Sequence, residues 1–91
     1  MSSENKSINM LEVINEPISI LVNFGNNKVV PLFFKWRNKR YKIENLNLVH
    51  KKRDGDSMIY YFNVSDKANY FKLSFATKDL SWRIDELYFE G

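Results

Sequence analysis

Apolar side chains recur at every second position through most of the chain, and this period limits the possible folds more than any other feature. After Pro17, the side chains of Ile18, Ile20, Val22 and Phe24 share one side of an extended backbone. Further runs with this period span 30–36, 58–64, 71–75 and 80–84. Successive side chains of a β-strand point to opposite faces, so the pattern predicts strands with one buried face.

Short polar segments separate these runs and predict tight turns. Gly25, Asn26 and Asn27 tolerate positive φ angles, and Asn38 with Lys39 and Asp54 with Gly55 are typical of two-residue hairpin turns. Pro31 cannot donate a ladder hydrogen bond, which predicts an edge or a bulge in its strand. Strands joined by such turns form an antiparallel meander. The sequence therefore predicts an all-β fold with six antiparallel strands.

The parity of the inward-facing residues changes twice. Between Ile43 and Leu46 it moves from odd to even positions, which predicts a β-bulge or a sharp bend near Glu44 and Asn45. A second change is predicted at Asp85 in the last strand. Irregularities of this kind let a small sheet curl, so we expect a strongly coiled or barrel-like meander.

The first sixteen residues differ from the rest. Residues 1–6 are polar without a periodic pattern and predict a disordered tail. Residues 7–16 carry apolar side chains at helical spacing after Ser7, which predicts a short N-terminal helix or arm that ends before Pro17. Residues 17–91 are then expected to form a single β domain.

Several kinds of function find no support in the sequence. The chain has 91 residues, no cysteine and one histidine, His50, so a zinc site is excluded and no metal or cofactor is expected. No nucleophile with an oriented base is apparent, and we expect no enzyme activity. No apolar run approaches the length of a membrane span or a signal peptide, so we expect a cytoplasmic protein without membrane contact.

Positive charge is concentrated in the middle of the chain. Although the whole chain carries a net charge of only +3, residues 28–53 hold nine basic side chains against Glu44 alone, a net +8. Such asymmetry favours a polyanionic partner more than the total charge does. The candidate nucleic-acid-binding residues are the basic side chains around the two central turns and two outward-facing rings: Lys35, Arg37, Lys39, Arg40, Lys42, Lys51, Lys52, Arg53, Phe33 and Tyr61.

Three interpretations of this basic region stay open. Lysine and arginine can neutralise phosphates, and rings beside arginine can stack on unpaired bases. The same cations can instead form a solvated face that keeps an edge strand from aggregating, or they can bind an acidic protein. We expect Trp36 and Trp82 in the core, each with an indole N–H that needs a hydrogen-bond partner.

A proline-led strand, an apolar strand, a tryptophan-arginine turn and an arginine-tyrosine strand follow one another in the chain, and three later runs complete the pattern: 17–20, 31–37, 40–43, 61–64, 70–73 and 82–88. In these segments the chain resembles a small bacterial all-β family of unknown function. Similar segments occur at the C-terminal end of Y-family DNA polymerase-like proteins. The resemblance implies an accessory role in DNA repair or replication. Those relatives tend to have a tryptophan on the third strand, where this chain has Leu48 and His50.

Two hypotheses follow from the sequence. The first is a small basic binding module without enzyme activity that contacts nucleic acid through the cations around residues 35–42. The second is a protein-interaction or self-assembly module, such as a homodimer, that uses edge strands and exposed aromatic rings and has no nucleic-acid role.

Overall fold

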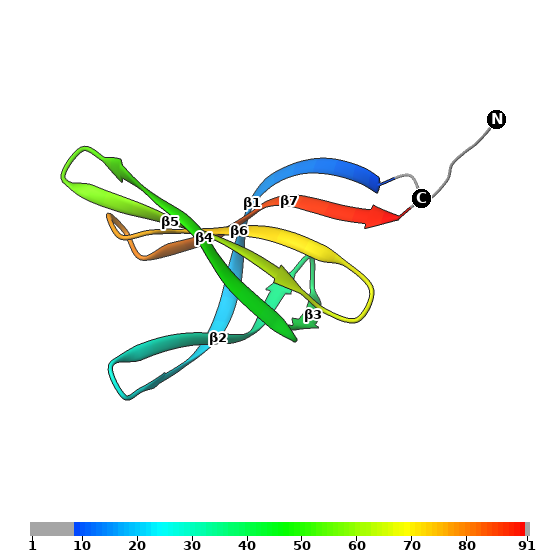
Figure 1. Ribbon diagram of the computed structural model, residues 1–91, viewed down its shortest axis with the longest axis horizontal. Helices are drawn as coiled ribbons and strands as arrows, with labels where there is room; N and C mark the ends of the chain where they lie inside the picture. Colours follow the sequence, from blue (N-terminus) through cyan, green and yellow to red (C-terminus); the bar gives the residue numbers. More distant parts are fainter. Residues whose placement is uncertain (1–8, 91) are drawn as a thin grey trace.

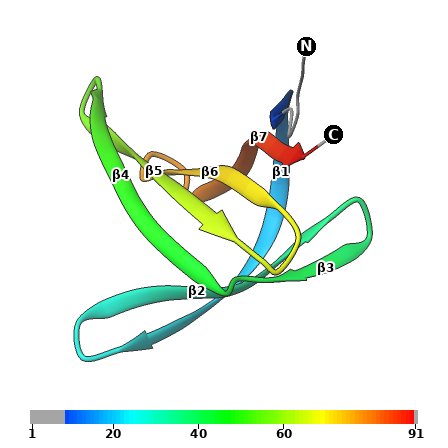
Figure 2. The same ribbon diagram turned by 45° about the vertical axis from the view of Figure 1, so that its right-hand side comes forward.

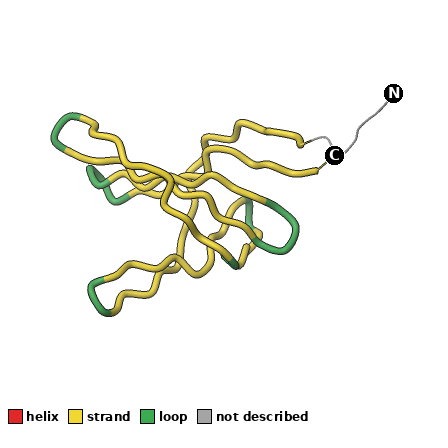
Figure 3. Tube along the Cα trace, viewed as in Figure 1, coloured by secondary structure: helices red, strands yellow, loops and turns green. Residues whose placement is uncertain are grey.

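The computed structural model describes residues 9–90, which form one antiparallel sheet of seven strands (Figure 1). The strands are β1 (Asn9–Gly25), β2 (Lys28–Trp36), β3 (Lys39–Lys42), β4 (Asn45–Asp54), β5 (Ser57–Ser65), β6 (Tyr70–Ala76) and β7 (Ser81–Glu90). Their order in the sheet is β3-β2-β1-β7-β6-β5-β4. The described residues contain strands and loops but no helix (Figure 3). The prediction of an all-β antiparallel fold is confirmed.

Most strands that are neighbours in the sheet are consecutive in the chain, as in a meander, but the sheet is not closed into a barrel. Each strand pairs with the next along the chain except β3 with β4, which are the two edges of the sheet, and β1 pairs with β7. The chain crosses between the edges at two residues, where Ile43 N–H donates to the Leu32 carbonyl of β2 (2.9 Å) and Glu44 N–H donates to the Ser65 carbonyl of β5 (2.8 Å). These bonds hold the two edges near each other without a β3–β4 ladder, so the barrel-like prediction holds only for the curl of the sheet.

The predicted number of strands is wrong by one because of the bend at this crossing. The sequence predicted one strand that continues through Glu44 and Asn45 with a bend or a bulge, whereas the structure ends β3 at Lys42 and begins β4 at Asn45. The other predicted irregularities are present. The β6–β7 register shifts beside Asp85, and the β1–β2 register shifts beside Pro31.

The predicted N-terminal helix is wrong for the residues that the structure describes. Residues 9–16 instead form the first half of β1, in which residues 9–13 and Glu16 pair with β7. Leu11 and Val13 lie on the outer face, 54% and 62% exposed, which explains why the apolar pattern there did not alternate cleanly. The predicted tail, residues 1–6, and the first two residues of the predicted helix lie outside the described residues.

The core lies on the inner face of the curled sheet. Its fully enclosed members come from the period-two runs of four strands: Phe34, Trp36, Val64, Phe71, Leu73 and Ile84. Three aromatic rings are at its centre. Phe34 stacks on Tyr41 with 5.0 Å between centroids, and Phe71 meets both rings edge-on. Such pairs add about 0.5–1.5 kcal/mol each beyond the area that they bury.

Candidate nucleic-acid interface

The β2–β3 hairpin carries the first basic cluster, and its turn fixes which side chains share a face. Arg37 and Asn38 have φ angles of 52° and 65°, the combination required by the two-residue turn that suits a twisted hairpin. The turn therefore lies one residue earlier than the predicted Asn38–Lys39 turn. As a result Lys35 is directly opposite Arg40 and Phe33 is directly opposite Lys42.

These four residues form the outer surface of the hairpin, which we call the cationic face: Phe33, Lys35, Arg40 and Lys42. The Arg40 guanidinium lies over the Phe33 ring, 5.4 Å from its centroid. Beside them is a shallow depression of about 310 Å³, whose lining includes Leu21 and no carboxylate. Like charges directly opposite each other in a sheet are destabilising, so the Lys35 and Arg40 pair costs stability in the free protein.

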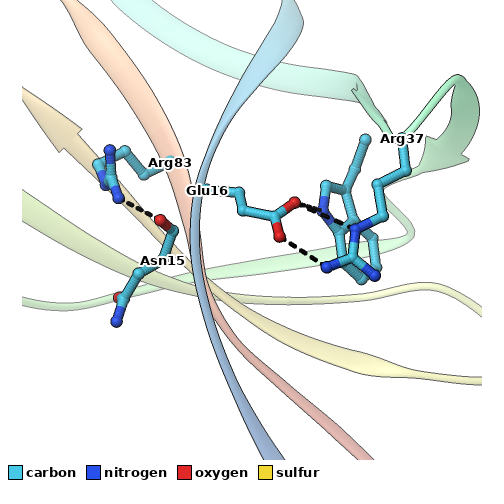
Figure 4. A network of polar contacts seen from close by, with 5 residues as sticks. Asn15, Glu16, Arg37 and Arg83 are labelled. Carbon is cyan, nitrogen blue, oxygen red and sulfur yellow. Dashed lines mark hydrogen bonds and ion pairs between the residues drawn. The ribbon is translucent and has the colours of Figure 1, made fainter.

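Arg37 and Lys39 of the same hairpin are engaged elsewhere, Arg37 with Glu16 (Figure 4) and Lys39 with Tyr41. Arg37 donates to the Glu16 carboxylate from Nε (3.1 Å) and Nη2 (2.6 Å), and Trp36 Nε1 donates to the same carboxylate (2.7 Å). These bonds lower the pKa of Glu16 and raise the pKa of Arg37 from their ordinary values. Lys39 has its ammonium 5.2 Å from the Tyr41 ring centroid. Only three of the five predicted hairpin cations therefore point away from the core on one face.

A bulge in β1 brings Glu16 to the hairpin. Asn15 has a φ of 54°, and the β1–β7 register shifts between Val13 and Glu16. The Asn15 carbonyl accepts a hydrogen bond from the Arg83 guanidinium, on the other side of β1 from the Glu16 carboxylate (Figure 4). The sequence reasoning missed this carboxylate. An Asn-Glu-Pro sequence that interrupts an alternating run is the signal that could have revealed the bulge.

The second basic cluster lies on the edge strand β4, away from the first. Figure 2 shows the β2–β3 turn and the β4–β5 turn on opposite sides of the molecule. The three cations also divide between faces. Lys52 is opposite Ile59 on the outer face, whereas Lys51 is opposite Tyr60 and Arg53 is opposite Met58 on the inner side. The eight predicted cations are therefore divided among several surfaces.

Tyr61 also lies apart from Phe33. The two rings are on β5 and β2, which β1, β7 and β6 separate in the sheet. Tyr61 stacks on His50 with 4.5 Å between centroids, and the Lys72 ammonium lies 5.7 Å from the Tyr61 centroid. Among the predicted residues, the structure thus brings together Phe33, Lys35, Arg40 and Lys42.

The outer face of the central strands holds two half-buried acids, Asp85 and Glu86. Asp85 accepts a hydrogen bond from the Ser74 hydroxyl (3.0 Å), and burial raises its pKa above the ordinary value. Within residues 9–90, no three metal-ligating side chains gather at one place. None of these residues forms a helix that is long and apolar enough to cross a membrane.

No protein-family model, curated protein or solved structure matches the chain. The resemblance to the small bacterial family stays a prediction from the sequence.

Proposed function

We propose that the protein binds single-stranded nucleic acid on the cationic face of the β2–β3 hairpin, without enzyme activity. The observation that supports this most is the Lys35 and Arg40 pair, directly opposite each other beside a depression whose lining has no carboxylate. The phosphates of a polyanion relieve the repulsion between the two cations. Each phosphate that a cation neutralises also releases counterions from the nucleic acid.

The aromatic ring supplies the second part of the interface. Phe33 is half-buried and Arg40 lies over it, so the ring and the guanidinium offer flat surfaces beside the cations. Stacking of one base on such a platform is worth about 1–3 kcal/mol and depends little on sequence. The resemblance implies the matching biological role, an accessory to DNA repair or replication.

Fluorescence anisotropy of a labelled oligothymidine titrated with the protein tests this function. Three cations that each neutralise one phosphate predict a log–log salt slope of about −2, because the slope for single strands is roughly −0.7 per phosphate. Affinity should then fall by about tenfold to twentyfold between about 50 and 200 mM salt. No binding at the lower salt concentration, or binding that ignores salt, would contradict the proposal.

A double variant identifies the surface. Lys35→Gln with Arg40→Gln removes the opposed pair and should reduce affinity by at least about tenfold and flatten the salt slope. The matched control is Lys67→Gln with Lys78→Gln, which removes the same charge from exposed positions on two other loops. Equal weakening by both pairs would indicate attraction to net charge rather than a site.

The second candidate function is self-assembly through β4. This strand is an edge of the sheet, and Leu48 and Val49 on it are 52% and 48% exposed. A bulge between Leu48 and His50 and the cations that follow disfavour strand addition, which is why we place this function second. Light scattering over a range of protein concentrations tests it, since a strict monomer at the highest concentration would exclude it.

A further inference from the structure

The inner face of the sheet ends in a groove that the nucleic-acid proposal does not use. Its volume is about 690 Å³. It lies between β1 and the β5–β6–β7 strands, on the side where the β1–β2 and β4–β5 hairpins spread apart in Figure 1. Seven of the eight lining residues have apolar or aromatic side chains, and the eighth is Thr77: Ile20, Val22, Tyr60, Phe62, Phe75, Thr77, Leu80 and Trp82.

An aromatic row forms one wall of the groove. Tyr60, Phe75 and Trp82 are cross-strand neighbours on β5, β6 and β7, so their side chains share the inner face. The ring centroids of Phe75 and Trp82 are 4.8 Å apart, and Phe62 stacks on Trp82 at 5.5 Å. These rings are only half-buried, so an apolar occupant would remove further apolar area from water.

Cations mark one end of this row. Lys51 is the cross-strand neighbour of Tyr60 and extends the row onto the edge strand, while Arg53 is the neighbour of Met58 one step further along. The groove lining includes no carboxylate, and Lys51 lies just outside it, on the strand next to the lining residue Tyr60. An apolar cavity with positive charge at one rim complements a ligand with an apolar body and a single anionic end.

The polar groups of the lining favour an acyl chain over a peptide. The Thr77 hydroxyl already exchanges hydrogen bonds with the backbone of Met58. A peptide in the groove would bury amide groups among rings, and an unpaired buried amide is costly, whereas a hydrocarbon chain needs no partner. The volume also lies within the range of about 300–1,000 Å³ that is usual for small-molecule sites.

We propose that this groove binds one molecule of a single-chain fatty carboxylate. The chain lies along the aromatic row of Tyr60, Phe75 and Trp82, and the carboxylate pairs with Lys51. Arg53 adds positive charge at the same rim.

Titration of the whole protein with octanoate, decanoate and dodecanoate, all below their micelle concentrations, tests this site. Calorimetry measures the affinity, and tryptophan fluorescence reports on Trp82 at the groove. Burial of methylenes predicts affinity that rises by about fourfold for each one added. Decanol, which has the chain of decanoate without the charge, should bind at least about tenfold more weakly.

Two adjacent lysines provide a matched pair of variants. Lys51→Gln should weaken dodecanoate binding by about tenfold, because it removes a charged partner at the rim. Lys52→Gln removes the same charge from the outer face of the same strand and should leave affinity unchanged. Val22→Trp, which fills the groove from β1, should abolish binding, and the Lys35→Gln and Arg40→Gln double variant should bind dodecanoate normally.

Three results would overturn this proposal. One is the absence of saturable binding of dodecanoate. Another is equal weakening by Lys51→Gln and Lys52→Gln, which would indicate general attraction to charge. The third is binding to vesicles of anionic phospholipid without binding of free dodecanoate, which would identify a membrane surface as the partner.

Discussion

The two tryptophans lie on β2 and β7, the strands on either side of β1, and only the end of the core around Trp36 is sealed. Trp36 is 7% exposed, and its indole N–H donates to Glu16, as the sequence led us to expect of a core tryptophan. Trp82 is half-buried and lines the groove. Both lie on the inner face, so the period of the strand does not distinguish them. What differs is how the chain returns to cover each one.

At the sealed end, two irregular parts of the chain lie near Trp36. The β1 bulge directs Glu16 to its indole, and the crossing at residues 43–44 follows Tyr41, whose ring packs on Phe34 and Phe71. At the groove end the β1–β2 and β4–β5 hairpins spread apart (Figure 1), although each of them also carries a register shift. What covers Trp36 is therefore not irregular geometry in general but the side chain that the β1 bulge directs to it, together with the rings beside the crossing.

Truncating one phenylalanine at each end should give the largest contrast. Phe71→Ala removes a ring that is 2% exposed and should reduce the free energy of unfolding by about 3–5 kcal/mol. Phe75→Ala removes a half-buried ring beside a groove and should cost about 1–2 kcal/mol. Urea unfolding followed by circular dichroism measures both. Equal losses would mean that the groove closes in solution.

The β1 bulge provides the next largest effect. Asn15→Val places a β-branched residue at a φ of 54° and should destabilise the fold by about 1–3 kcal/mol. Asn15→Gly is the control, because glycine adopts this conformation without strain, and it should stay near the wild type. A loss of the same size in both variants would show that the Asn15 side chain, rather than its backbone angle, matters.

At the open end, a substitution of Leu80 should stabilise the fold, by less than the preceding variants destabilise it. It lies in the β6–β7 turn with a φ of 58° and is 72% exposed, so little burial compensates its strained backbone. Leu80→Asn should raise the free energy of unfolding by about 0.5–1 kcal/mol, because asparagine tolerates this region. Thermal unfolding of Leu80→Asn and Leu80→Val should shift in opposite directions.

Acidification should change the contributions of Glu16 and Asp85 to the stability of the fold in opposite directions. Hydrogen bonds from Arg37 and Trp36 lower the pKa of Glu16 from its ordinary value, so the ionised carboxylate stabilises the fold above the ordinary pKa, and this stabilisation is lost as the pH falls through the lowered pKa. Glu16→Gln should therefore lose less stability on acidification than the wild type.

Burial raises the pKa of Asp85, so its contribution to the pH dependence has the opposite sign. Asp85→Asn should therefore lose more stability on acidification than the wild type. Urea unfolding between about pH 6 and about pH 3 measures both slopes.

The recurrence of apolar side chains at every second position was enough to predict most strands, because each of these strands buries one face. It failed in the first half of β1, where the exposed Leu11 and Val13 lie on the outer face and a bulge follows at Asn15. Apolar residues on both faces gave a spacing that also fits a helix. The bend near Glu44 was predicted, but a parity change does not tell whether a strand bends or ends.

The candidate sites were harder to predict, since they depend on which strands meet. The sequence placed the basic residues around two turns, whereas the register divides them further, between the two faces of one hairpin and an edge strand. The engagement of Arg37 by Glu16 depends on a contact across 21 positions of sequence. The groove could not be predicted either. Phe75 and Trp82 stand at alternating apolar positions of their strands, and this alternation is the same whether the inner face is covered or open.

The β1–β7 ladder has a consequence for the order of folding. Its register joins Asn9 to Glu90 and Ile18 to Trp82, so the centre of the sheet is built from the most distant parts of the described chain. On either side, β1–β3 and β4–β7 consist of hairpins that can form locally within microseconds. Pairing of β1 with β7 closes the long chain between them into a loop, and the entropy lost in this closure opposes the formation of that ladder. We therefore expect two preformed halves that dock late, with the β1–β7 pairing as the slow step.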